Sequence, residues 1–550
     1  MKNKNDLAFL ILAGKINLPK YNFKLNEYLF NIGNSLALEK ILKKLSIDSE
    51  KKVYVAITKK NVKFTNFLPF KNVEFIEVGQ TTTILDSISR GIKKVPQKNI
   101  AIIPITTIPD ISKIEENSCY FGSKEIPKEN WSAIKKIDNN NNLRFLFKED
   151  TDSYGLLSNP CTGRIVVKKV HLEKVLKEVK EDKKSDILSI VKILITKFKY
   201  KIIFEKWFDV GHETTYLDTK LSTITSRFFN NVFYRESTNT ILKLSSETKK
   251  IKGEYLYYEN LPRKLKSFFP FIFSQYNSND YINSIEMEFV PYPNLAEIFL
   301  FKNIGPNAWI RIISSLRNIY KSFYEAENYV LSDCSWLYSK KLLSRFNKTV
   351  NYIENSNNTI LKKLLTEKIC VNKKFYIGDL FSEVKKLRDY FLKYENSINQ
   401  YLGHGDLCFN NILVEQISGC VKLIDPKAFL NKKYNNVGYI DPHYDLAKLN
   451  HSYKYLYDSV VNNLYSISIE NDNLDLNIYA PQEYNLVNKL FDEMLVSKRI
   501  NSDHLRMISS SLFLSMLPLH VDDEKRMICF AILGSIALNN LELNKIIVQI

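Results

Sequence analysis

The sequence predicts an α/β domain with a mostly parallel sheet over residues 1–205, followed by an α+β region that becomes helical from about residue 295. Three observations predict this order. Apolar runs alternate with segments of helical period up to about residue 200, strand-like segments follow, and helical periodicity dominates the remainder. A chain of 550 residues is also too long for one hydrophobic core, so several domains are expected.

Four apolar runs in the first 200 residues have the length of buried strands, and helical segments lie between them. The predicted strands cover residues 7–12, 53–57, 73–78 and 100–105, and the predicted helices cover residues 35–45 and 83–92. Alternation of strand and helix predicts a mostly parallel sheet that is covered on both faces. A Lys-rich amphipathic segment, residues 172–198, follows the last of these strands.

The pattern changes near residue 205, where we place the first domain boundary. Residues 231–235 and 240–244 are strand-like, and the polar residues between them predict a β-hairpin. We therefore predict three regions, residues 1–205, 206–294 and 295–550. The third is largely helical, with a second strand pair near residues 412–425.

The net charge of +18 raises the question of nucleic-acid binding. The lysines are scattered through the whole length, and the sequence contains no compact arginine block and no zinc-finger, RRM or KH motif. We therefore expect no nucleic-acid partner. A basic surface would instead attract anionic small ligands such as nucleotides or phosphosugars.

The seven cysteines are odd in number and form no CxxC pair, so neither a disulfide framework nor a structural zinc site is expected. A reducing compartment follows from this. The apolar run after the charged N-terminus spans only residues 7–13, which is too short for a signal peptide, and no stretch reaches 18 apolar residues. We expect a cytoplasmic protein with no membrane span.

The strongest functional pattern is HGDLCFNNIL, residues 404–413, which is followed by two short apolar strands and then Asp425. Phosphoryl transfer needs an in-line hydroxyl, Mg²⁺ on the phosphates and positive charge on the transferred group. Asp406 would orient the attacking hydroxyl, while Asn411 and Asp425 supply the oxygen ligands that Mg²⁺ prefers. His404 would fix the loop through hydrogen bonds to the backbone. The pattern therefore predicts a phosphotransferase that uses Mg²⁺ and a nucleotide.

The HGDxxxxN pattern with its later Asp resembles the aminoglycoside phosphotransferase and choline kinase family, which is related to the protein kinases. The resemblance covers roughly residues 220–550 and implies a bilobal protein-kinase-like fold with a helical C-lobe. It implies ATP and Mg²⁺ as cofactors and the hydroxyl of a small molecule as acceptor. It also implies that Asp445, in the Asp-Leu-Ala segment, anchors the catalytic loop.

The resemblance further implies a nucleotide site in the N-lobe. Lys243 lies on a predicted strand with apolar neighbours and is the candidate for the lysine that contacts the phosphates. Glu254, in a predicted helix, is the candidate for its partner. Residues 286–290 resemble the hinge whose backbone binds adenine. The family's Gly-rich loop is absent, since residues 226–231 read SRFFNN.

Residues 1–205 resemble the sugar-nucleotide nucleotidyltransferases. The likeness rests on a strand that runs into Leu12-Ala13-Gly14, on residues 79–82 (GQTT) before a helix, and on the strand at residues 100–105. The Gly-rich loop after Gly14 is missing. The Gly-Asp pair expected soon after the strand at residues 100–105 is also missing, and the first Asp after that strand is Asp110. Because a triphosphate cradle needs glycines at positions of close approach, we expect a degenerate domain with a substrate-positioning or structural role.

The paired resemblances are similar to bacterial capsule and lipooligosaccharide synthesis proteins, so the leading hypothesis is an ATP-dependent kinase of a sugar or polar alcohol in surface-polysaccharide synthesis. A choline- or ethanolamine-type kinase fused to a cytidylyltransferase is one alternative. A second is a non-catalytic nucleotide-binding protein. An antibiotic-modifying kinase is a variant of the kinase hypothesis, and it predicts acidic residues around the acceptor because aminoglycosides are polycations.

Overall fold

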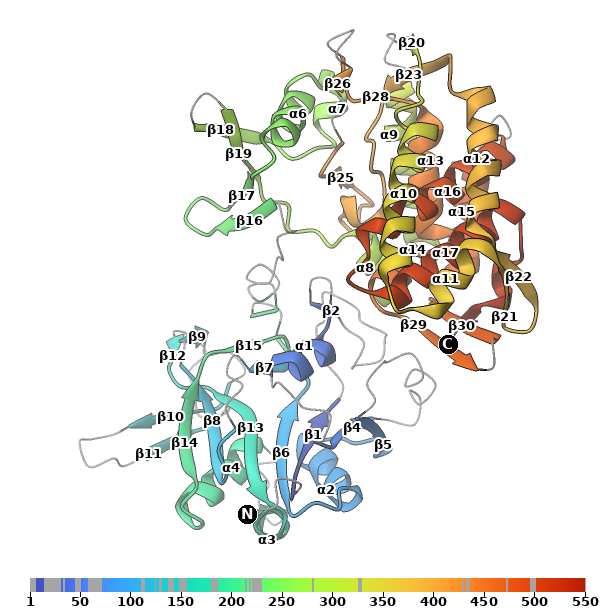
Figure 1. Cartoon of the computed structure of the whole chain (residues 1–550). Helices are drawn as coiled ribbons and strands as arrows, with labels where there is room; N and C mark the ends of the chain where they lie inside the picture. The colour runs from blue at the N-terminus through green and yellow to red at the C-terminus, as the bar shows by residue number, and fades with distance from the viewer. Residues whose placement is uncertain are drawn as a thin grey trace. The chain divides into compact units, whose positions relative to one another are not determined.

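The computed structural model divides into two compact units, residues 1–223 and residues 224–550, which are described separately (Figure 1). The structure describes residues 6–13, 31–32, 35–44, 51–57, 72–109, 114–123, 125–127, 131–136, 143–147, 156–179, 186–212, 215–216, 219, 230–278, 281–324, 329–427, 430–431, 436–470, 473–494 and 501–549. Among these residues, no helix combines the length and the apolar character that crossing a membrane requires.

Unit 1 is built on a seven-stranded sheet with the strand order β14-β8-β13-β6-β1-β4-β5. The strands are β1 (Leu7–Leu12), β4 (Val53–Ile57), β5 (Val73–Glu77), β6 (Asn99–Pro104), β8 (Ser118–Gly122), β13 (Cys161–Lys168) and β14 (Lys201–Glu205). The four predicted strands form the continuous parallel half β6-β1-β4-β5. β13 runs antiparallel to both of its neighbours, so the sheet is mixed but mostly parallel, as predicted.

Helices α1 (Ala37–Lys44), α2 (Ile84–Lys94), α3 (Lys169–Val179) and α4 (Ile187–Thr196) complete the main part of unit 1. The Thr83 side chain accepts a hydrogen bond from the Asp86 N–H and so caps α2. Ile88 and Ile92 on the buried face of α2 belong to the same core cluster as Leu10 of β1. The amphipathic segment predicted at residues 172–198 overlaps two helices, α3 and α4.

Short strand pairs surround this core: β2 (Asn31–Ile32) with β3 (Ser35–Leu36), β7 (Thr107–Pro109) with β15 (Trp207–Asp209), β9 (Ile126–Pro127) with β12 (Leu156–Leu157), and β10 (Ala133–Lys136) with β11 (Leu143–Leu146). Strand β15 (Trp207–Asp209) pairs with β7 and belongs to unit 1. Gly14 and Asp110, on which part of the nucleotidyltransferase resemblance depends, lie outside the described residues, as do residues 226–229.

Unit 2 begins with a four-stranded antiparallel sheet in the order β16-β17-β19-β18. Its strands are β16 (Asn230–Arg235), β17 (Thr240–Ser245), β18 (Ile272–Ser278) and β19 (Tyr281–Glu288). The predicted hairpin is the pair β16–β17, with Arg235 opposite Thr240. Helix α6 (Thr248–Glu259) packs on this sheet through Ile251, which lies in one cluster with Ile285 and Met287 of β19.

The remainder of unit 2 is dominated by helices, as predicted (Figure 1). They are α7 (Arg263–Lys266), α8 (Leu295–Phe301), α9 (Pro306–Tyr324), α10 (Ser339–Asn355), α11 (Thr359–Thr366), α12 (Leu380–Tyr394), α13 (Pro442–Tyr453), α14 (Tyr457–Val461), α15 (Tyr484–Met494), α16 (Ser502–Met516) and α17 (Glu524–Asn539). Helix α17 is buried over most of its length, and a Cβ on Gly534 would lie 2.8 Å from Leu514 of α16. The glycine therefore allows the two helices to pack closely.

The largely helical region also contains strands that were not predicted from the sequence. A five-stranded sheet is formed by β21 (Lys368–Val371), β22 (Phe375–Gly378), β29 (Tyr465–Glu470), β30 (Asn473–Ala480) and β31 (Ile547–Gln549). The remaining strands are β20 (Val330–Ser332), β23 (Ile398–Leu402), β24 (Ile412–Val414), β25 (Val421–Leu423), β26 (Leu430–Asn431), β27 (Asn436–Val437) and β28 (Tyr439–Ile440). The predicted strand pair near residues 412–425 is the hairpin β24–β25.

Candidate active site

The predicted catalytic loop lies between two elements of sheet. Strand β23 leads into residues 403–406, a short 3₁₀ turn covers Phe409–Asn411, and the hairpin β24–β25 returns the chain to Asp425. The Ile424 N–H donates to the Asn411 carbonyl oxygen at 3.0 Å. This hairpin therefore brings two residues that are far apart in the motif to the same place.

Asp406, Asn411 and Asp425 converge on one site. The side-chain amide of Asn411 donates to the Asp406 carbonyl oxygen at 2.8 Å, which leaves the amide oxygen of Asn411 as the side-chain atom for a cation. The ammonium of Lys427 lies 3.6 Å from Asp406 Oδ2 and 3.4 Å from Asp425 Oδ2. Two carboxylates thus face one cationic group, and oxygen ligands of this kind suit Mg²⁺.

His404 holds the loop through its ring. Its Nε2 lies 3.0 Å from the Ile424 carbonyl oxygen, and its Nδ1 accepts from the Asp406 N–H at 3.3 Å. Burial lowers the pKa of His404 to about 4, so the ring is neutral near pH 7 and Nε2 carries the proton in this arrangement. His404 therefore ties Asp406 to the strand end before Asp425, the loop-fixing role expected from the sequence.

Asp445, on helix α13, anchors the loop from the other side. Its two oxygens accept the backbone N–H groups of His404 at 2.6 Å and Gly405 at 2.8 Å. Gly405 has a φ of +79°, and a Cβ on Gly403 would lie 2.8 Å from Asp445 Oδ2. Gly405 of the motif and Gly403 just before it therefore permit both the turn and the close approach of the carboxylate.

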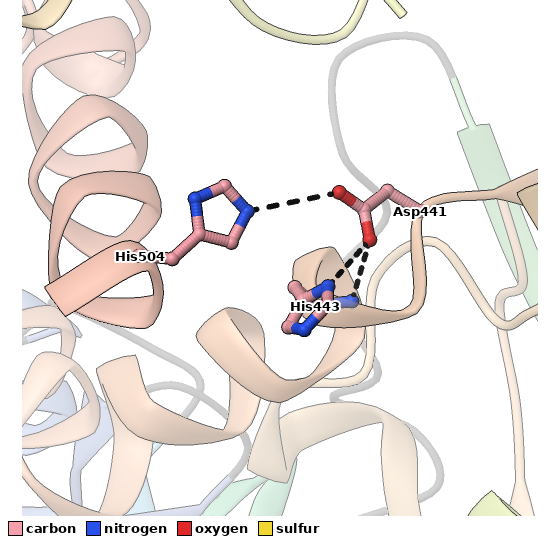
Figure 2. A group of neighbouring side chains, drawn as sticks. All are labelled: Asp441, His443 and His504. Carbon is pink, nitrogen blue, oxygen red and sulfur yellow. Dashed lines mark hydrogen bonds and ion pairs between the residues drawn. The ribbon is translucent and has the colours of Figure 1, made fainter. Parts of the chain in front are cut away.

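Asp441 fixes the N-terminus of α13 (Figure 2). Its Oδ1 accepts from the His443 N–H and lies 2.9 Å from the His443 ring Nδ1, while the hydroxyls of Tyr338 and Tyr394 donate to Oδ2 at 2.7 and 3.1 Å. His504 of α16 also points toward this carboxylate, with Nε2 3.9 Å from Oδ2. The side-chain atoms of Asp441, His443 and His504 that could bind a metal lie within 4.8 Å of one another. Both oxygens of Asp441 are already hydrogen-bonded, so we assign the cluster to holding α13, and through it Asp445, in place.

The two residues predicted to pair at the nucleotide site, Lys243 and Glu254, are in contact. Lys243 of β17 contacts Glu254 Oε2 of α6 and Asp425 Oδ1, each at 2.6 Å. Burial works against the charge of Lys243, but the two carboxylates outweigh it and raise its pKa above the ordinary value. Burial likewise raises the pKa of Glu254, and Lys243 opposes that rise. One turn after Glu254, the Tyr257 hydroxyl donates to the Gly403 carbonyl oxygen at 3.0 Å, so α6 is fixed to the catalytic loop.

The segment predicted as the hinge spans the end of β19 and the turn after it. It leads toward α8, and the Val414 N–H of β24 donates to the Pro293 carbonyl oxygen at 2.9 Å within this connection. The connection between the four-stranded sheet and the helical region therefore runs beside the β24–β25 hairpin. Its role in binding adenine stays a prediction.

Sequence reasoning missed two lysines at the site, Lys427 and Lys448. Lys448 lies on α13, one turn after Tyr444, and its ammonium is 3.0 Å from Asp406 Oδ1. Both lysines stand within or just beyond recognised motifs, Asp425-Pro426-Lys427 and Asp445-Leu-Ala-Lys448. They carried no distinguishing signal because Lys and Arg together number 78 in this chain.

These lysines determine the ionisation of Asp406. Burial favours the neutral carboxyl, but Lys448 and then Lys427 outweigh it and hold the pKa of Asp406 well below its usual range. The carboxylate is therefore ionised throughout the physiological pH range. It is a good hydrogen-bond acceptor for a hydroxyl group and a weak proton acceptor.

If this loop is catalytic, its anchor predicts that kcat falls as the pH is lowered through about 7. Burial raises the pKa of Asp445 to about 7. The ionised carboxylate accepts the N–H groups of His404 and Gly405, and protonation weakens this anchor, so activity is present above pH 7 and lost below it. The contribution of Asp445 to the free energy of unfolding changes with pH in the opposite direction. Because its pKa is raised in the folded protein, Asp445 favours folding most at acid pH, and this contribution is lost as the pH rises through about 7.

A pH–rate profile of the wild type and of Asp445→Asn checks this. The variant cannot titrate at this position, so its profile should be flat between about pH 6 and 8, at a lower kcat. A step near pH 7 that persists unchanged in Asp445→Asn would show that another group causes it.

Neither a family model nor the sequence of a curated protein matches this chain. Solved structures do match it. A protein from Bacillus anthracis crystallised with sucrose, described as a candidate glucose-1-phosphate thymidylyltransferase, is 17% identical and covers 40% of this chain and 97% of its own, with a TM-score of 0.33. HddC from Yersinia pseudotuberculosis is 14% identical over 39% of this chain and 97% of its own, with a TM-score of 0.29.

An aminoglycoside phosphotransferase from Streptomyces rimosus is 14% identical and covers 54% of this chain and 91% of its own, with a TM-score of 0.31. The solved structures that this chain resembles thus include nucleotidyltransferases, which match its N-terminal region, and an aminoglycoside phosphotransferase, the two kinds of protein that the sequence motifs indicated.

Proposed function

We propose that unit 2 is an ATP-dependent phosphotransferase that acts on the hydroxyl of a small molecule. The observation that carries this proposal is the convergence of Asp406, Asn411 and Asp425 with the Lys243–Glu254 pair. These groups come from a β-strand, a helix and two loops that are widely separated in the sequence. Their joint position supplies the oxygen ligands and the positive charge that phosphoryl transfer requires.

The donor set fits a magnesium-bound nucleotide. Asn411 and Asp425 would hold Mg²⁺, which when bound would neutralise charge on the phosphates. Lys243 would then contact phosphate oxygens while Glu254 keeps its ammonium in place. Asp425 has a φ of +57°, a conformation that non-glycine residues rarely adopt, and such backbone outliers are concentrated at functional sites.

Asp406 would orient the acceptor hydroxyl by accepting its hydrogen bond. The hydroxyl oxygen forms a bond to the γ-phosphorus while the bond from that phosphorus to the β–γ bridging oxygen breaks, which yields a phosphate monoester and ADP. The hydroxyl proton passes to a phosphoryl oxygen of the product and then to solvent, because Asp406 holds a proton only weakly. Lys427 and Lys448 are placed to offset the negative charge at Asp406.

Transfer of label from γ-labelled ATP to a panel of sugars and polar alcohols tests the proposal. The wild type should label at least one acceptor, and Asp406→Ala should label none while still binding Mg–ATP. ATP binding by both proteins without transfer to any acceptor would instead favour the nucleotide-binding alternative.

A further inference from the structure

The two oxygens of the Asp406 carboxylate face different partners. Oδ2 faces Lys427, which also contacts Asp425 and therefore belongs to the proposed nucleotide side. Oδ1 faces Lys448, at 3.0 Å, and Lys448 extends from α13. An acceptor hydroxyl that reaches Asp406 without entering the nucleotide side must therefore approach beside Lys448.

Lys448 is part of a basic cluster, which we define as Lys341, Lys448 and Tyr444, and Tyr444 lies one turn before Lys448 on α13. The Lys341 ammonium of α10 donates to the Tyr444 hydroxyl at 2.5 Å and lies 4.8 Å from the centre of the Tyr444 ring. Burial and then Lys448 lower the pKa of Lys341, although Tyr444 opposes this, and Arg345 acts in the same direction as Lys448. The positive charge of Lys448 therefore disfavours the charged form of Lys341.

The cluster also acts on the tyrosine. Burial favours the neutral phenol, but Lys341 and then Lys448 outweigh it and lower the pKa of Tyr444. Two cations and a polarised hydroxyl thus share one site. Of these three groups, only Lys448 contacts the Asp406 carboxylate that faces the site. Lys448 is already paired with Asp406, whereas burial disfavours the charged form of Lys341, and an anion beside Lys341 would offset that cost.

We propose that the acceptor carries an oxyanion, a phosphate or a carboxylate, which binds Lys341 and Lys448 while a hydroxyl of the same molecule reaches Asp406. This inference rests on the proposed phosphotransferase function and specifies its substrate class. A sugar phosphate or a sugar acid has the required chemistry. Choline, ethanolamine and aminoglycosides are cations, and this cluster repels them.

Two series of related acceptors that include neutral, cationic and anionic members test the inference. One series contains glucose, glucosamine, glucuronate and glucose 6-phosphate, and a second contains glycerol, ethanolamine, glycerate and glycerol 3-phosphate. ADP release in the full-length wild type should be fastest with an anionic member, with kcat/KM at least about tenfold above its neutral and cationic counterparts, as charge-assisted hydrogen bonds imply. Phosphate and carboxylate members distinguish the two oxyanions.

Lys341→Met should raise KM for the preferred anionic acceptor by about 10-fold or more, with a much smaller change in kcat, and Lys341→Arg should retain most of the affinity. Lys340→Met is the matched control, because the neighbouring Lys340 side chain is 73% exposed and its nearest anionic partner, Asp333, is 3.9 Å away. A purely structural role for Lys341 would instead lower stability and kcat with every acceptor alike.

Turnover of a neutral or cationic member as fast as its anionic counterpart would overturn the inference. The inference would also be overturned if the wild type binds Mg–ATP, Asp425→Asn weakens that binding, and no anionic acceptor is used; the proposed nucleotide site would then stand without the acceptor inference. If the wild type shows no Mg–ATP binding at all, the proposed function fails first. The charge preference of the wild type is informative even if Lys341→Met does not fold.

Discussion

Asp406→Asn is expected to lower kcat by about 10²–10⁴-fold while changing the affinity for Mg–ATP by no more than about twofold. In the proposed mechanism the carboxylate orients the acceptor hydroxyl, and the amide keeps its shape but not its charge. Asp425→Asn should behave differently, because Asp425 contacts Lys243 directly and is, in the proposal, a charged ligand of the metal–nucleotide complex. It should weaken Mg–ATP binding as well as turnover.

Steady-state kinetics and Mg–ATP titration of the two variants measure this contrast. Asp389→Asn, on the exposed surface of α12 with a side chain 48% exposed, is the control and should match the wild type. Equal losses of nucleotide affinity in Asp406→Asn and Asp425→Asn would mean that Asp406 belongs to the nucleotide site rather than to the acceptor site.

Lys243→Met is expected to abolish measurable Mg–ATP binding and to lower the free energy of unfolding by about 3 kcal/mol. Lys243 neutralises Glu254 inside the protein, where the two side chains are 10% and 9% exposed. The other Glu254 oxygen, Oε1, has no hydrogen-bond partner among the residues that the structure describes, so removal of the lysine leaves a buried carboxylate without its cation.

The double variant Lys243→Met/Glu254→Gln separates stability from binding. It removes the uncompensated charge, so most of the lost stability should return, whereas Mg–ATP binding should not. Thermal unfolding and equilibrium binding measure the two effects, and Lys252→Met, at an exposed position of α6, is the control. Recovery of nucleotide binding in the double variant would show that Lys243 has only a structural role.

The residues of the catalytic loop could be predicted because their chemistry is local in sequence. Asp406 and Asn411 are five positions apart, and the apolar strands before Asp425 predict the hairpin that returns the chain to them. The parallel half of the unit 1 sheet was predictable for a similar reason, since three of its four strands, β1, β4 and β6, are mostly apolar runs. Pairing of Lys243 with Glu254 required the family resemblance in addition.

Other features depend on contacts that a single sequence does not encode locally. Lys448 and Lys341 reach the site only because α13 and α10 pack in unit 2, and neither differs in sequence from dozens of other basic residues. Strands β29 and β30 carried a period-two alternation, YSISIE and NLDLNIYA, that predicts strands and was overlooked within helical surroundings. A place in surface-polysaccharide synthesis, a cytoplasmic location and a degenerate role for unit 1 stay predictions.

A crystal structure of the full chain with Mg²⁺ and a non-hydrolysable ATP analogue tests the central claim most directly. The account predicts a metal at about 2.0–2.1 Å from the Asn411 amide oxygen and an Asp425 carboxylate oxygen, with Lys243 on the phosphates and Asp406 facing the γ-phosphoryl group. A nucleotide bound only in unit 1, or a metal away from Asn411 and Asp425, would contradict it.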